Sequence, residues 1–407
     1  MITKIYNIKS FITYDTSIKD VAIKKLDSIL LKDDHIYKIN YNYNNNNDKI
    51  DNQIDAKNNI ITPGFIDSHT HMIFSSHRAN DFSKRISGKT YLDIAKSGGG
   101  IKSSINSLRN SSKDELFNKC KKQISYFIKN GTTTVEAKSG YGLTLQDEIK
   151  SLEVIRELND LTDIDLVPTF MGAHDFPNEI KEKSSYVDLI CNEMIPEISS
   201  KKLAEFCDVF CENNYFDHKQ TLKIAESAKK YDLKMKLHAD EFEDSNAAYL
   251  AGEIKAISAD HLMKSNLNGL KNMAKNNVIA TLLPATTLFL GMNTYASGKM
   301  IIESGCEVAI ASDYNPGSST IYSLPLVMAL SCLYCGLSIN EAFKAITYNA
   351  AKSINRENSI GLIKEGYSAD ILFWEIDNLN EIPYWFNSDR LSAVMKKGKL
   401  ILKNNIN

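Results

Sequence analysis

The 407-residue chain lacks any long hydrophobic segment and any excess of one charge. No apolar run reaches the roughly 18 residues that a membrane-spanning helix needs, and the first residues lack the basic and apolar regions of a secretion signal. The 48 basic and 50 acidic side chains give a formal net charge of −2, which offers no electrostatic footprint for nucleic acid or an anionic membrane. We therefore expect a cytoplasmic protein that binds neither nucleic acid nor a membrane.

Cysteine is also scarce. Seven cysteines, an odd number in a chain of this length, do not suggest a disulfide framework. Cys207 and Cys211 lie in an alternating apolar run, which indicates packing in a buried strand. Cys332 and Cys335 have the spacing of a zinc or redox pair, but their segment looks helical and no second such pair completes four ligands. We interpret both pairs as packing residues.

Histidine, in contrast, occurs in an informative position. Residues 63–71, PGFIDSHTH, end an apolar strand with His69 and His71, one residue apart. Residues two apart on a strand share a face, so both imidazoles can converge on one cation. Two solvated histidines at a strand end are the alternative, and only further ligands elsewhere in the chain favour the metal.

The pattern of apolar residues predicts two architectures in one chain. With 43% hydrophobic residues the chain can bury a large core. The first 60 or so residues alternate apolar and polar side chains, which predicts short antiparallel strands, and the asparagine-rich residues 41–47 suggest a solvated loop. From Pro63 onward, short apolar runs alternate with helical patterns, as in parallel strands joined by helices. The predicted strands are 64–68, 132–137, 165–171, 208–211, 234–237, 256–259, 278–283 and 307–312.

Eight parallel strands over about 250 residues match an α/β fold of the (β/α)₈ TIM-like barrel type, whose active sites lie at the C-terminal ends of the strands. Five of the eight histidines fall just past a predicted strand end, which scattered core histidines would not do. The polar residues at these ends are His69, His71, Lys138, Tyr141, His174, Glu212, His238, His261 and Asp313.

Strands resume near the C-terminus, where residues 361–374 precede a hairpin predicted over residues 393–402. We expect this segment to pair with the N-terminal strands. The predicted division is therefore residues 1–62 and 356–407 for one small β-sandwich, with the barrel, residues 63–355, inserted between them.

The motifs resemble those of the amidohydrolase superfamily, and within it those of the imidazolonepropionases. The motifs of the first, fifth and eighth barrel strands are superfamily-wide, whereas residues 138–143 (KSGYGL) and 313–319 (DYNPGSS) are similar to imidazolonepropionases in particular. The segments that carry the resemblance are 63–71, 97–101, 131–143, 172–174, 238–241, 258–262 and 312–319.

The resemblance implies a metal-dependent cyclic amidohydrolase. Three imidazoles and one carboxylate, from His69, His71, His238 and Asp313, would hold zinc or iron(II) and leave a position for water, whose pKa such a metal lowers. A cap for the turn at Asn315 is the alternative for Asp313. Superfamily members with two metals use a lysine of the fourth strand, and this strand ends in Glu212 instead, so one divalent ion is implied.

Two further residues are expected to move protons or stabilise charge. Glu241 follows His238 by three residues, as in deaminase relatives, and would shuttle protons; an exposed acid at a helix N-terminus is its alternative. His261 would hydrogen-bond the substrate carbonyl or the attacking water in its neutral form, unless it is simply packed. Asp313 would also accept the proton of that water.

The substrate that the resemblance implies is 4-imidazolone-5-propanoate, hydrolysed to N-formimidoyl-L-glutamate in histidine degradation. Arg78 would bind its carboxylate bidentately, although a surface arginine is the simpler reading. The remaining expected substrate contacts are Tyr141, His174, Asn315, Gly317 and Ser318. A homodimer is expected from the family. A related cytosine or guanine deaminase and a non-catalytic scaffold with this fold are the two alternatives.

Overall fold

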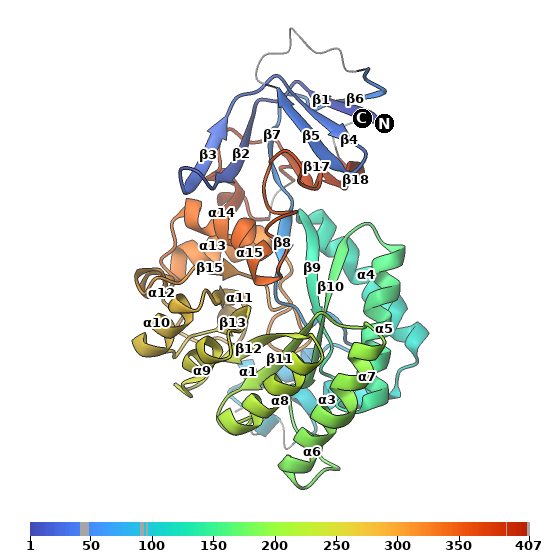
Figure 1. The fold of residues 1–407 in the computed structure, drawn as a ribbon, viewed down its shortest axis with the longest axis vertical. Helices are drawn as coiled ribbons and strands as arrows, with labels where there is room; N and C mark the ends of the chain where they lie inside the picture. Colours follow the sequence, from blue (N-terminus) through green and yellow to red (C-terminus); the bar gives the residue numbers. More distant parts are fainter. Residues whose placement is uncertain (41–48, 90–92, 95–96, 388, 405–407) are drawn as a thin grey trace.

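The computed structural model describes residues 1–40, 49–89, 93–94, 97–387 and 389–404 (Figure 1). The loop expected at residues 41–47 lies outside these ranges. Among the described helices, none combines the length and the apolar character that crossing a bilayer requires. All seven cysteines are free thiols, and Cys207 and Cys211 are buried in a strand, as the alternating pattern predicts.

Eight parallel strands form the barrel, in the same order in space as in sequence, which confirms the predicted fold class. No strand end differs from its predicted position by more than two residues. The first and last strands meet through the residues that follow them, since the Asp313 N–H donates to the His69 carbonyl at 3.1 Å. The strands are β8 Phe65–Asp67, β9 Thr132–Lys138, β10 Asp165–Ala173, β11 Phe206–Cys211, β12 Lys234–Ala239, β13 Ser258–His261, β14 Ile279–Leu282 and β15 Val308–Ile310.

Helices surround the barrel, and several begin with sequence signals that fix their start. Ser112, Asp217 and Ser338 each form a capping box with the residue three positions later, which satisfies backbone N–H groups of the first turn. The helices are α1 Ala79–Ile86, α3 Ile101–Asn110, α4 Lys113–Lys129, α5 Leu145–Leu161, α6 Lys183–Leu189, the π-helix η2 Ile190–Met194, α7 Ile195–Ser200, α8 His218–Lys230, α9 Ala247–Glu253, α10 Leu267–Lys275, α11 Pro284–Phe289, α12 Gly298–Glu303, α13 Leu324–Tyr334, α14 Ile339–Ile346, α15 Tyr348–Ser353 and α16 Glu381–Tyr384.

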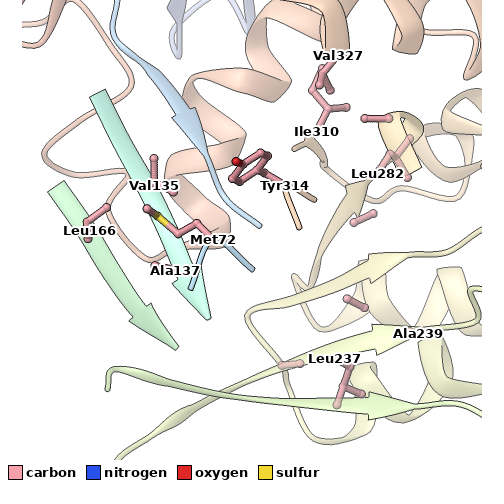
Figure 2. Close-up of a cluster of buried hydrophobic side chains, with 14 of the residues drawn as sticks. Met72, Val135, Ala137, Leu166, Leu237, Ala239, Leu282, Ile310, Tyr314 and Val327 are labelled. Carbon is pink, nitrogen blue, oxygen red and sulfur yellow. The ribbon is translucent and has the colours of Figure 1, made fainter. Parts of the chain in front are cut away.

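The barrel strands divide their side chains between two environments. Because successive residues of a strand point to opposite faces, β9 and β12 each present an apolar and a charged row. Val135 and Leu237 belong to the apolar core that includes residues of the surrounding helices (Figure 2). Glu136 and Lys236 lie on the other face, and they are also buried. The interior of the barrel is therefore lined by polar groups.

A small β domain lies at one end of the barrel and is built from both termini (Figure 1). Its two sheets enclose a separate apolar core that includes Ile29 and Leu31 from one sheet and Ile61 and Phe373 from the other. The C-terminal strands join the N-terminal ones through the pairing of β16 with β7. The strands are β1 Ile2–Tyr6, β2 Ser10–Asp15, β3 Asp20–Lys24, β4 Ser28–Lys32, β5 His35–Asn40, β6 Asn52–Asp55, β7 Ile60–Pro63, β16 Ile371–Trp374, β17 Leu391–Lys396 and β18 Lys399–Lys403.

One sequence-based expectation for this domain is wrong in part. The hairpins β4–β5 and β17–β18 are antiparallel as expected. The pairs β1–β6 and β2–β7, however, are parallel. Alternation of apolar and polar residues gives the faces of a strand but not the direction of its partner, and each parallel pair joins strands that are far apart in the sequence. The exact domain limits, after residues 62 and 355, stay a prediction.

Candidate active site

Four side chains at the C-terminal mouth of the barrel converge on one point. The Nε2 atoms of His71 and His238 lie 3.1 Å apart, and Asp313 Oδ1 lies 3.6 Å from Nε2 of both His69 and His71. All four residues are buried. Tetrahedral zinc with bonds of about 2.0–2.1 Å separates its ligand atoms by about 3.3 Å. Donor atoms of His69, His71 and Asp313 lie within 4.8 Å of one another, and so do those of His69, His238 and His261, so these residues could hold a divalent ion.

The free atoms of these rings agree with that geometry. Nε2 of His69 is buried and has no hydrogen-bond partner among the described residues, while Nδ1 of the same ring lies 2.6 Å from Asp260 Oδ2. Nδ1 of His238 likewise lies 3.1 Å from Asp208 Oδ1. A carboxylate on one ring nitrogen fixes the tautomer and leaves the other lone pair for a metal. The described residues thus fit a metal ion.

Burial sets the charge of the groups in this site. It lowers the pKa of His69, His71 and His261 well below the ordinary value of histidine, so these rings are neutral and keep the lone pairs that a cation needs. Burial also raises the pKa of Asp313 to about 6, in the absence of any ion. Its Oδ2 accepts a hydrogen bond from Thr286 Oγ1 at 2.5 Å.

His261 and Glu241 lie next to each other beside the four converging groups. Nε2 of His261 is 3.5 Å from Glu241 Oε2, and both residues are buried. Burial and then the charge of Asp313 raise the pKa of Glu241 well above its usual range. Glu241 is not on a helix, so the alternative of an exposed helix N-terminal acid does not apply. His261 has a φ of 77°, a strained backbone that ends β13 and is typical of functional positions.

The converging groups open into a cavity of about 750 Å³. Arg78 lies in its wall, directly before α1, and its guanidinium packs against Gly317: a Cβ placed on this glycine would lie 1.2 Å from Arg78 Nη2. Arg85, which we did not predict as a site residue, also lines the cavity, and its Nη2 donates to the Gly317 carbonyl at 3.3 Å. This wall is therefore cationic.

Tyr141 and His174 form another part of the wall. Both are buried, and the ring of His174 stacks on that of His71 with centroids 4.8 Å apart. Nδ1 of His174 lies 3.0 Å from the Gly140 carbonyl, which assigns the proton to that nitrogen and directs the other nitrogen away from it. Burial lowers the pKa of His174 to about 3, so its ring is neutral.

The loop after Asp313 is held together by Asn315. Its Oδ1 accepts the N–H groups of Gly317 and Ser318 at 2.8 and 2.7 Å, and its Nδ2 donates to the Asp313 carbonyl and to Ser318 Oγ. These residues line the cavity as expected. The amide of Asn315 is engaged by its own loop, so in this structure it shapes the turn.

Comparison with known proteins agrees with this site. The amidohydrolase family model matches residues 60–401. Imidazolonepropionase of Thermoanaerobacter pseudethanolicus is 45% identical over 345 residues, which cover 84% of this chain and 83% of that protein. Imidazolonepropionase of Geobacillus kaustophilus is 43% identical over 352 residues, covering 86% and 83%. This chain belongs to the imidazolonepropionases. It is a hydrolytic enzyme of the amidohydrolase family.

Solved structures show how widely this fold occurs. An adenosine deaminase from Xanthomonas campestris, solved with bound zinc, superimposes with a TM-score of 0.76 at 12% identity and covers 99% of this chain and 93% of its own. A 5-methylcytosine deaminase from Klebsiella pneumoniae gives a TM-score of 0.74 at 15% identity, with 98% of both chains covered. At these identities the likeness concerns the fold alone.

Sequence reasoning missed the charged residues that lie below the converging groups. Asp208 and Asp260 hold ring nitrogens of His238 and His69, and Lys236 donates to the Ser68 carbonyl at 2.9 Å. A signal was present for Asp208, which is a charged residue in the otherwise apolar strand β11. Because both faces of a parallel barrel strand are buried, a charge there indicates a paired polar interior.

Proposed function

We propose that this imidazolonepropionase hydrolyses the ring amide of 4-imidazolone-5-propanoate to N-formimidoyl-L-glutamate, with one divalent ion, zinc or iron. The ion would be held by His69, His71, His238 and Asp313. The observation that carries the proposal is the proximity of these four groups at the base of a cavity whose wall carries the half-buried Arg78. Such an ion lowers the pKa of water towards neutrality and polarises a carbonyl group.

The residues around the ligands supply proton transfer. Asp313, whose carboxylate lies among the groups that would hold the ion, would accept the proton of the attacking water. Glu241 lies beside His261 and carries a proton towards the ring nitrogen that leaves. Neutral His261 donates a hydrogen bond to the oxygen of the carbonyl as negative charge develops there.

The substrate is oriented by the opposite wall of the cavity. Arg78 binds the propionate carboxylate, since a guanidinium matches a carboxylate with two parallel hydrogen bonds. Tyr141 and His174 hydrogen-bond the imidazolone ring. Gly317 and Ser318, in the turn that Asn315 holds, contact the substrate and the carboxylate that hydrolysis creates.

The test is reconstitution of the metal-stripped enzyme with zinc or iron(II), followed by loss of imidazolone absorbance. We expect one ion per chain and turnover with at least one metal. His238→Ala should lose the ion and turnover together, while His35→Ala, an exposed histidine of the β domain, should keep both. Full turnover by the His238 variant without bound metal would refute the mechanism, and ammonia release from cytosine or guanine would favour a deaminase.

Two further statements belong to the proposal. The absence of long apolar helices among the described residues and the bacterial relatives support a cytoplasmic location. A homodimer remains the expectation from the family, and sedimentation velocity measures it directly.

A further inference from the structure

Below the four converging groups lies a layer of charged side chains that the proposed mechanism does not use. It consists of three carboxylates and two ammonium groups, and every one of these side chains has an exposed fraction of 0%. Burying so many charges is costly unless they are closely paired. The members of this buried charge layer are Glu136, Lys138, Asp208, Lys236 and Asp260.

Lys138 stands at the centre of the layer. Its Nζ lies 2.7 Å from Glu136 Oε1 and 2.7 Å from Asp208 Oδ2. Burial alone would lower the pKa of Lys138, but the charges of Asp208 and Glu136 raise it above the ordinary value, so the side chain is an ammonium ion. Lys236 is farther from Glu136, with Nζ 3.7 Å from Oε1.

The carboxylates around Lys138 reach the proposed ligands from behind. Asp208 Oδ1 lies 3.1 Å from Nδ1 of His238, and Asp260 Oδ2 lies 2.6 Å from Nδ1 of His69. The other oxygen of Asp260, Oδ1, is buried and has no hydrogen-bond partner among the described residues. Each of these acids thus has one oxygen on a histidine and a second oxygen directed elsewhere.

Two carboxylates of the layer, together with the proposed ligand His69, have the spacing of a cation site. His69, Asp208 and Asp260 each offer one ligand atom, and these atoms lie within 4.8 Å of one another. Oxygen and nitrogen donors at such distances suit a divalent cation. In the wild-type chain, however, the Lys138 ammonium is bound to one of the carboxylates and supplies the positive charge.

We propose that the Lys138 ammonium takes the place of a second divalent cation beneath the active site. It thereby keeps the centre at one ion, and through Asp208 it orients the ring of His238. Lys138 is a positioning residue, because it touches neither the substrate nor the proposed ligand atoms. The inference rests on the proposed function in one respect, namely that His69, His71, His238 and Asp313 hold one ion, in what we call the upper site.

The experiment counts ions. Wild-type enzyme and Lys138→Ala are stripped of metal, dialysed against excess zinc, freed of unbound zinc and analysed for zinc per chain. We expect one zinc in the wild type and two in the variant, because the substitution removes the cation that Asp208 binds directly. Methylammonium should compete with the second zinc of the variant, and it should leave the zinc content of the wild type unchanged.

Affinity for the first ion gives a second readout. Loss of a residue that orients a ligating histidine typically weakens metal binding by about 10–100-fold. We expect Lys138→Ala to weaken the tighter zinc site by such a factor, and methylammonium to restore part of the affinity. A lysine that only filled space would change neither the number of ions nor the response to methylammonium.

Controls keep the outcome decisive. The double variant Lys138→Ala, Asp208→Asn removes a carboxylate from the second cation site, formed by His69, Asp208 and Asp260. Its zinc content should return to one ion per chain. If Lys138→Ala does not fold, the double variant Lys138→Ala, Glu136→Gln can replace it, because it removes one positive and one negative charge together. This variant keeps His69, Asp208 and Asp260, and it should bind two zinc ions. One zinc in every folded Lys138 variant, or two in the wild type, overturns the inference. A wild type that binds no zinc or iron overturns the proposed function instead.

Discussion

Arg78 is the residue on which we expect substrate affinity to depend most. A hydrogen bond to a charged group contributes about 1.5–3 kcal/mol, which corresponds to a factor of roughly 10–100 in affinity. Arg78→Met should therefore raise KM for the imidazolone by about this factor and change kcat less, as steady-state kinetics will show. Arg156→Met, at an exposed position of α5, is the matched control. An unchanged KM in the Arg78 variant would contradict the anchoring role.

Gly317 supports the same arginine. Alanine at this position would place its Cβ 1.8 Å from Cζ of Arg78, so the guanidinium must move. We expect Gly317→Ala to raise KM as Arg78→Met does, with the zinc content unchanged. The two substitutions should not add in a double variant, because both remove the same interaction. Additive effects would show that Gly317 acts on the substrate independently of Arg78.

Single residues also show what sequence patterns reveal about a site. The histidines at strand ends are visible because their period-two spacing and their positions after apolar runs are local features. The partners of these histidines are not visible in the same way. Asp260 meets His69 across 191 positions of sequence, and only the closed barrel brings them together. The engagement of Asn315 by its own loop likewise depends on the folded turn.

Helix α5 holds a wall of the active site through one buried side chain. Both oxygens of Glu148 accept backbone N–H groups of the preceding loop, from Gly140 at 3.0 Å and from Gly142 and Leu143 at 2.9 and 2.8 Å. This loop carries Tyr141. A glutamine there would turn an amide N–H₂ towards N–H groups that need an acceptor.

We therefore expect Glu148→Gln to lower the free energy of unfolding by about 1–3 kcal/mol and to raise KM, because the loop that carries Tyr141 loosens. Urea denaturation and steady-state kinetics measure the two effects. Glu157→Gln on the same helix is the control: this side chain is 43% exposed and pairs with Lys113, so its loss should cost less than about 1 kcal/mol. Equal effects of both substitutions would contradict the role of Glu148.

Barrel strands were easier to predict than the strands of the β domain, for a physical reason. Each barrel strand is a short apolar run bounded by a helical pattern, so its limits are marked on both sides. The terminal strands are paired by contacts distant in sequence, such as β16 with β7, and their direction depends on the connections between them. The sequence therefore predicted short strands in both terminal segments and a hairpin over residues 393–402, but not that β1–β6 and β2–β7 are parallel.

At the scale of the whole molecule, the β domain and the candidate active site lie at opposite ends of the barrel. The β domain packs near the ends at which β9 and β10 begin, and the active site lies where these strands end (Figure 1). A buried ion cluster joins the two parts: Nζ of Lys396 in β17 lies 2.6 Å from Asp370 and 2.8 Å from Asp165 of β10.

This cluster predicts how stability depends on pH. Burial would raise the pKa of Asp165, but Lys396 and then Lys397 lower it below its ordinary value. Burial would lower the pKa of Lys396, but Asp370 and then Asp165 raise it above its ordinary value. The contribution of Asp165 to the free energy of unfolding is therefore complete above its unfolded pKa of about 3.9, and it is lost as pH falls through the lower folded pKa. That of Lys396 is complete below about 10.4 and is lost as pH rises through the higher folded pKa.

Lys396→Met should consequently reduce the free energy of unfolding by about 3–5 kcal/mol at pH 7, because it leaves Asp370 buried without its cation. The deficit relative to wild type should shrink as pH falls below the unfolded pKa of about 3.9, because Lys396 stabilises the charged form of Asp165 and this stabilisation is lost there. Lys397→Met removes a neighbouring ammonium that is 51% exposed and also pairs with Asp165, so it should cost less than about 1 kcal/mol. Urea denaturation at several pH values measures the stability of both variants. If the deficit of Lys396→Met stays constant from pH 7 to pH 3, the lost stability comes from packing and not from charge.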